Sequence, residues 1–170
     1  MRRESFCMQT NTMNFARKLL SLLLLGLLGA CSSKKAAESN KEINGTQAER
    51  IAAVSKIITS HTPLPGPLID GNFREEQTGD GNLGPSDFAS FCALRVAPAD
   101  LPAWKAALKP LEAQNTPPKY MAPKKAESWW LPAADFGGLE FFSPKDLTGR
   151  VNGWIGIAPD GRIFIHSFTM

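Results

Sequence analysis

Histidine and cysteine, the usual carriers of nucleophilic and metal chemistry, are scarce in this sequence. The 170 residues include two histidines and three cysteines, namely His61, His166, Cys7, Cys31 and Cys92. Neither a Gly-x-Ser-x-Gly nor a His-Glu-x-x-His motif accompanies them. His166 precedes Ser167 in an expected strand, where neighbouring side chains point to opposite faces, so the two cannot form a dyad. His166 stays a catalytic candidate, but a structural or hydrogen-bonded role is the expected one.

A long apolar run is also missing. The leucine-rich segment from Leu19 to Leu28 is too short to cross a hydrocarbon layer, which takes roughly 20 apolar residues as a helix. Arg17 and Lys18 precede the segment and small residues follow it, which is the three-part pattern of a secretory signal. We therefore predict a signal peptide over residues 1–30, in which residues 1–12 are either an over-extended start or a long initial region.

The signal ends in Leu28-Gly29-Ala30-Cys31, which resembles the lipobox of bacterial prolipoproteins. The resemblance implies diacylation of the Cys31 sulfur, cleavage before Cys31 and acylation of the new amino group. Two or more acyl chains, such as palmitate, hold a protein stably on a membrane. Ser32 follows the cysteine where some lipoproteins have aspartate, which in diderm bacteria implies release to the outer membrane. We therefore predict a lipid-anchored protein of the cell envelope that faces the periplasm.

Charge of one sign is lacking once the signal is removed. The whole chain carries 19 Lys and Arg against 16 Asp and Glu. Residues 1–30 contain four of these cations and one of the acids, so 15 of each sign remain and the mature chain is formally neutral. Because nucleic-acid binding needs a basic patch, we expect no nucleic-acid partner.

After the signal, the composition divides the chain into two parts. Residues 31–43 are short, polar and charged, as expected of the lipidated cysteine and a flexible tether. Residues 44–170 have the length of a single globular domain. This domain contains one cysteine, Cys92, so it can hold no internal disulfide and no cysteine-based zinc cluster. Cys92 lies in an apolar run, where a small buried side chain is the expected role.

The pattern of the domain predicts an α+β fold. Thr46 and Glu49 have the spacing of a capping box at the start of a helix that ends near His61. We expect a strand over residues 88–96, a second helix capped by Asp100, and strands over residues 139–142, 151–158 and 162–169. The prediction is an antiparallel sheet of about four or five strands with two helices packed on one face, ending in a C-terminal β-hairpin. The C-terminal part of the domain, including Asn152-Gly153-Trp154-Ile155-Gly156, resembles the endings of uncharacterised bacterial lipoproteins. This resemblance assigns no particular activity to the chain.

Residues 69–87 are the most polar and glycine-rich stretch, and we expect them to form a long loop. A pair of its carboxylates could serve in glycoside hydrolysis, the candidates being Asp70, Glu75, Glu76, Asp80 and Asp87. The spacing of Asp80, Asn82 and Asp87 also brings together oxygen ligands of the kind that calcium prefers. The stretch departs from the EF-hand pattern, because Gly84 and Phe91 stand where ligands are needed. A solvated loop without metal or cofactor is therefore the prediction.

Tryptophan is concentrated in the C-terminal half of the domain. Trp129 and Trp130 are adjacent in an expected strand, so one would face the core and the other would lie nearer the surface. An exposed tryptophan beside Lys124 and Lys125 suits protein recognition, because tryptophan is enriched at interface hot spots. With Trp154, these residues are the candidate binding surface, although packing of both in a two-sided sheet is the alternative.

The function expected from these features is a non-catalytic binding or interaction module held at the envelope by acylated Cys31. Its expected partners are the membrane and another envelope protein, and an inhibitor or immunity-type lipoprotein is one form it could take. Two alternatives stay open. One is a small envelope hydrolase that uses the loop carboxylates, and the other is a structural lipoprotein of an outer-membrane assembly.

Overall fold

The computed structural model describes residues 40–59, 62–78, 86–111 and 118–170. The lipobox and signal peptide, His61 and Asp80 therefore lie outside the described residues. In chain order the elements are β1 (Asn40–Glu42), α2 (Gln47–Ile58), β2 (Asp70–Thr78), β3 (Asp87–Arg95), the 3₁₀ turn η1 (Pro98–Asp100), α3 (Leu101–Ala107), the 3₁₀ helix η2 (Ala133–Gly138), β4 (Glu140–Phe142), α4 (Lys145–Thr148), β5 (Asn152–Ile157) and β6 (Arg162–Phe168). None of the helices in these ranges is long and apolar enough to cross a membrane.

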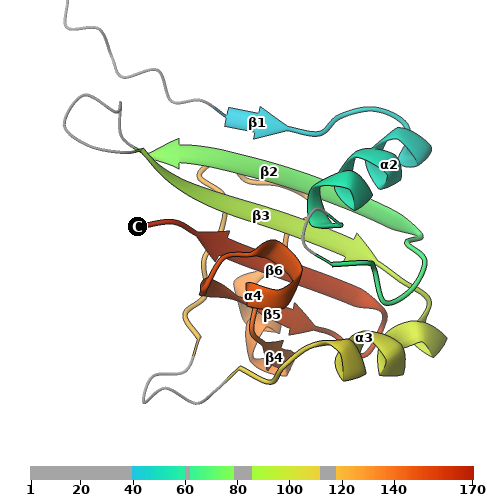
Figure 1. Ribbon diagram of the computed structural model, residues 1–170. Helices are drawn as coiled ribbons and strands as arrows, with labels where there is room; N and C mark the ends of the chain where they lie inside the picture. The colour runs from blue at the N-terminus through green and yellow to red at the C-terminus, as the bar shows by residue number, and fades with distance from the viewer. Residues whose placement is uncertain (1–39, 60–61, 79–85, 112–117) are drawn as a thin grey trace, which may run out of the picture. The chain divides into compact units, whose positions relative to one another are not determined.

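The strands form one open antiparallel sheet in the order β1-β2-β3-β6-β5-β4 (Figure 1). The fold is α+β, as the sequence predicts, and β5 and β6 form the expected C-terminal hairpin. The sheet has six strands instead of four or five. One extra strand is β1, which pairs with β2 and lies in the range expected to be tether.

The largest correction is at residues 69–87, where the sequence predicts a long loop. Residues 70–78 are the strand β2, which pairs with β3 along its whole length from Asp70↔Arg95 to Thr78↔Asp87. The polar side chains of this strand are compensated by ion pairs, and its glycine has a packing role. A side chain at Gly71 would meet Val54 of α2 at 3.2 Å, so the glycine lets the helix lie close to the sheet.

Two smaller expectations are also wrong. Asp100 makes no side-chain capping hydrogen bond, because η1 precedes α3 and holds Asp100 in a helical conformation. Trp129 and Trp130 lie in a turn and not in a strand, and their rings contact each other at a centroid distance of 5.9 Å. By contrast, the capping box of Thr46 and Glu49 is present and starts α2 as expected.

The two faces of the sheet have different covers. The helix face packs against α2, α3 and α4 through a mainly aliphatic core that includes Val54, Leu94 and Ile163. Figure 1 shows α2 and α4 in front of the sheet. The other, which we call the aromatic face, packs against residues 118–139 through Phe91, Trp130, Leu131, Trp154 and Phe164. This second cover contains η2 but no α-helix.

Candidate functional site

A groove of about 910 Å³ opens on the aromatic face, at the end of the sheet where β3 and β5 begin and β6 ends. Its sheet side is formed by aromatic and small residues, including Ala89, Trp154, His166 and Phe168. The opposite side comes from residues 109–111 and 118–121. Strand alternation places Trp154, His166 and Phe168 on this face, because β5 and β6 pair with Trp154 directly opposite His166. The groove thus brings together three of the residues that the sequence singles out, namely Trp154 and His166 from the two strands of the hairpin and Asp87 from the start of β3.

His166 is almost fully buried among aromatic rings. It is 2 % exposed, and its ring centroid lies 4.9 Å from that of Phe91, 5.4 Å from Phe168 and 5.9 Å from Trp154. Burial lowers the pKa of His166 to about 4, so the ring is neutral at pH 7. Its Nδ1 atom is buried and has no hydrogen-bond partner in the described part of the chain. In hydrolytic triads a carboxylate orients the histidine that acts as the base, whereas the described neighbours of His166 are aromatic rings.

Lysines stand around the groove. Lys109, Lys119 and Lys145 line it from three separate segments, whereas Asp87 is the one acid among its described lining residues. Lys109 reaches the exposed Asp146 at 3.2 Å, an ion pair that solvent screens. The groove therefore combines an apolar, aromatic side with a surplus of positive charge.

The three candidate tryptophans occupy different environments. Trp130 is 6 % exposed and lies in the core of the aromatic face, where its Nε1 donates to the carbonyl of Met121 at 3.0 Å. Trp154 is 3 % exposed, lines the groove and donates to the carbonyl of Lys119 at 3.1 Å. Trp129 is half-buried and lines a smaller hollow of about 160 Å³ with Arg95 and Arg162. Trp154 is thus the one that the groove includes.

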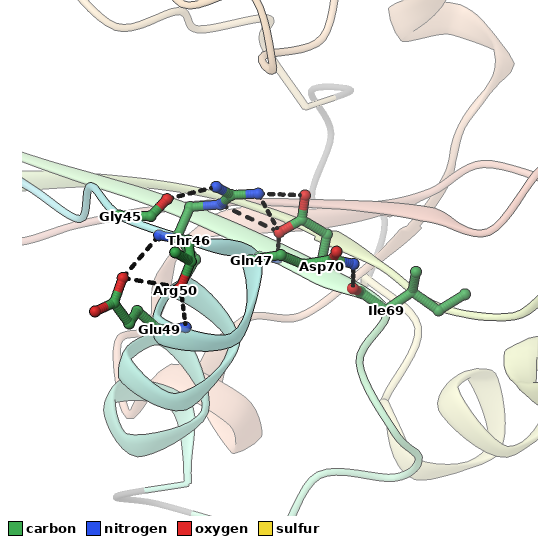
Figure 2. Close-up of polar contacts among 8 residues, drawn as sticks. Gly45, Thr46, Gln47, Glu49, Arg50, Ile69 and Asp70 are labelled. Atoms are coloured by element: carbon green, nitrogen blue, oxygen red, sulfur yellow. Dashed lines mark hydrogen bonds and ion pairs between the residues drawn. The ribbon is translucent and has the colours of Figure 1, made fainter.

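Asp70 is bound by the helix that covers β2. Arg50 of α2 donates to both carboxylate oxygens of Asp70, with the Nη2–Oδ2 distance at 2.7 Å, and also donates to the carbonyl of Gly45 (Figure 2). Gln47 donates to the carbonyl of Ile69 beside it. These contacts join the first turn of α2 to the start of β2. They use Asp70 as a structural partner.

Glu75 also has a cationic partner, on the helix face. Its Oε2 lies 2.8 Å from Nη2 of Arg150 and accepts from the hydroxyl of Ser90 at 2.9 Å. Arg150 also donates to that hydroxyl, so the three side chains form a closed network that joins β2, β3 and the start of β5. Glu75 is 24 % exposed, and its carboxylate is committed to this network.

The other carboxylates are equally dispersed. Glu76 is 4 % exposed and accepts from the backbone N–H of Lys124, which holds residues 118–139 against β2. Asp87 is exposed at the start of β3 and lines the groove. Asp70 and Asp87 lie at opposite ends of the β2–β3 pair, roughly 27 Å apart along the strand. A hydrolytic pair needs a separation of ~5–9.5 Å, which these two acids do not have.

Within the described ranges, no group of three or more His, Cys, Asp or Glu side chains could hold a metal ion. Cys92 is buried in the core of the helix face, and burial raises the pKa of its thiol, so the side chain packs as a small apolar group. Comparison of the chain with protein-family models, with curated proteins and with solved structures finds no match.

Sequence reasoning missed the lysines of the groove. Lys109, Lys119 and Lys145 are far apart in the chain and follow no periodic pattern. Lys109 approaches Lys145 because residues 109–111 join the edge of β4, where the N–H of Leu111 donates to the carbonyl of Phe141 and that of Ser143 to the carbonyl of Lys109. Lys119 is held at the groove by Trp154, whose Nε1 donates to its carbonyl. No local signal predicts these contacts.

Proposed function

We propose that this protein is a lipid-anchored binding module of the bacterial cell envelope, held by acylated Cys31, that binds a ligand in the groove without transforming it. The observation that carries the proposal is the groove itself. Its volume, about 910 Å³, lies within the range of ~300–1,000 Å³ that is typical of ligand sites, and its side chains combine apolar area with a few charges.

The positions of the candidate catalytic groups favour binding over hydrolysis. Asp70 and Glu75 are engaged by Arg50 and Arg150 on different parts of the fold. Asp87 does line the groove, but His166, which lines it as well, is neutral and packed among aromatic rings. Two carboxyl groups facing each other across this groove would have favoured the hydrolase, and the described residues do not supply them.

The anchor is tested by Cys31→Ser in the native host. We expect the wild type to incorporate labelled fatty acid and to fractionate with membranes, and the variant to lose the label and leave the membrane fraction. Cys92→Ser is the matched control. Because Cys92 is buried in the domain and is not the expected acylation site, this variant should keep both the label and the membrane association of the wild type. A variant that remains on the membrane, together with an unlabelled wild type, would refute the anchor.

Ligand binding in the groove is tested by site-specific photo-crosslinking in intact cells. Benzoylphenylalanine replaces Val151, which lines the groove and is 67 % exposed, so the large side chain is tolerated. Ile69, which is 43 % exposed and does not line the groove, receives the same replacement as a control. We expect an adduct at position 151 and none at 69. Absence of any specific adduct at 151 would refute the binding role, and the adduct's mass identifies the class of ligand.

A further inference from the structure

The groove has a polarity that restricts what it can bind. Its sheet side carries Ala89, Trp154 and Phe168, and the exposed apolar side chains of Met121 and Val151 lie at its mouth. Apolar side chains exposed in this way are stabilised by contact with a hydrocarbon or an aromatic group. The sheet side of the groove, which we call its floor, therefore suits an apolar chain.

The charges around the same groove have one dominant sign. Lys119 and Lys145 are both exposed, and neither side chain has an ion-pair partner among the residues that the structure describes. Lys109 shares an exposed pair with Asp146, and Asp87 is the one acid in the described lining. Two lysines held without counter-charges beside an apolar surface attract an anion.

A third observation comes from His166. Its Nδ1 atom is buried at the groove without a hydrogen-bond partner in the described ranges, although buried polar atoms are almost always satisfied.

A strand-like peptide is a poor fit for this site, since β3, β6 and β5 are interior strands and residues 109–111 already pair at the edge of β4. The groove offers side-chain charge and apolar area, and no free strand edge.

We propose that the groove binds a single-chain amphiphile with an anionic head group, with its hydrocarbon chain along the aromatic floor and its head group at Lys119 and Lys145. This inference rests on the proposed function, because it names the ligand class of the same groove. It makes the protein a carrier or sensor of acidic amphiphiles at the membrane that anchors it.

The probe is dodecanoate brominated near its methyl end, because bromine quenches tryptophan fluorescence at contact and Trp154 lines the groove. It is titrated into the full chain carrying Cys31→Ser, which keeps every described residue and carries no attached acyl group. We expect saturable quenching that weakens as salt is raised. The equally brominated dodecyltrimethylammonium, with the same chain and a cationic head, should bind at least about tenfold more weakly, since it meets lysines of like charge. Equal binding of the two probes, or no quenching, would overturn the proposal.

Charge reversal on the protein provides the matched test. The double variant Lys119→Glu with Lys145→Glu should weaken dodecanoate binding about tenfold or more. The control is Lys41→Glu with Lys56→Glu, which changes net charge by the same amount at two exposed lysines outside the groove. We expect less than a twofold effect from the control. An equal loss in both double variants would mean that only net charge attracts the probe, which would also overturn the proposal.

The outcomes separate this inference from the proposed function. If Val151 crosslinks to a protein while dodecanoate does not bind, the amphiphile proposal is wrong and the binding role stands. If neither crosslinking nor dodecanoate binding occurs, both proposals are wrong. A small adduct at Val151 whose mass fits an acidic amphiphile, with dodecanoate binding that depends on Lys119 and Lys145, supports both.

Discussion

The two faces of the sheet are both covered, but by different kinds of structure. Helices cover the helix face, and the longest, α2, satisfies most of its backbone hydrogen bonds within its own twelve residues. Residues 118–139 cover the aromatic face largely without such ladders, so their backbone groups need partners from side chains. Trp130 and Trp154 donate to the carbonyls of Met121 and Lys119, and Tyr120 donates to that of Leu131. Large aromatic residues with one polar atom suit this task, because they pack and donate at once.

This difference explains where a binding groove can form. A helix packs its side chains into a sheet continuously, whereas an irregular cover contacts the sheet only where its anchoring residues lie. The tryptophans fix residues 118–131 over the middle of the aromatic face, and the groove opens beyond them, where β3 and β5 begin. Both faces are buried, but the aromatic face alone combines its packed core with an accessible apolar site.

The largest expected effect comes from removing an anchor of the irregular cover. Trp130→Ala deletes a ring that contacts Phe91, Trp154 and Phe164, and it should cost about 3–5 kcal/mol of unfolding free energy. Because Trp130 connects the cover to the sheet, amide exchange in residues 118–139 should accelerate more than exchange in α2. Urea unfolding and hydrogen-exchange mass spectrometry measure the two quantities.

Trp104→Ala is the matched control on the helix face. Trp104 is fully buried there, so the variant should lose comparable stability. Its local exchange should accelerate around α3 and leave residues 118–139 protected until the whole domain unfolds. If Trp104→Ala releases residues 118–139 as readily as Trp130→Ala does, the two covers are not independent.

The next effect, about 3 kcal/mol, depends on pH and belongs to His166. Its folded pKa of about 4 lies below the ordinary value of 6.5, so between these values the unfolded chain binds a proton that the folded chain does not. Stability from this source is complete above pH 6.5 and is lost as pH falls toward 4. Urea unfolding at a series of pH values should show this slope, and NMR of the imidazole should report the low pKa directly.

His166→Phe removes the titrating group and keeps a ring among Phe91, Trp154 and Phe168. The variant should lose the slope between pH 6.5 and 4, while carboxylates still destabilise both proteins at lower pH. An imidazole of His166 that titrates near 6.5, or an unchanged slope in the variant, would show that burial does not hold this ring neutral.

Sequence reasoning succeeded where the determining interactions are local. The capping box at Thr46 and the short gap between the expected strands 151–158 and 162–169 are short-range signals, and they predicted α2 and the β5–β6 hairpin. It failed for β2, whose polar residues are typical of a loop. In the structure its charged side chains form ion pairs, namely Asp70 with Arg50, Arg74 with Glu42, and Glu75 with Arg150. Those partners lie between 20 and 75 residues away, so no window of the sequence contains them.

The candidate site was predicted only in part, for the same reason. Trp154 and His166 stand out by residue type, and the alternating pattern of the hairpin places them on one face. The lysines do not stand out, because tertiary contacts hold their segments at the groove, namely the pairing of residues 109–111 with β4 and the hydrogen bond from Trp154 to the carbonyl of Lys119. The carboxylates stood out by residue type, but the structure disperses them. Asp70, Glu75 and Glu76 lie at different strand positions, and each contacts a different partner.

The smallest expected effect concerns the start of the regular cover. Thr46→Ala removes the hydroxyl that accepts from the N–H of Glu49 and donates to its carboxylate, and it should cost about 1 kcal/mol. Because α2 carries its own hydrogen-bond ladder, the loss should appear as faster amide exchange in the first turn of α2, with residues 118–139 unchanged. Thr59→Ala, at the other end of α2, removes an exposed hydroxyl that donates to the carbonyl of Ser55 and should cost less than about 0.5 kcal/mol. If Thr46→Ala instead loosened the aromatic face, α2 would be coupled to the irregular cover, and the two covers would not be independent.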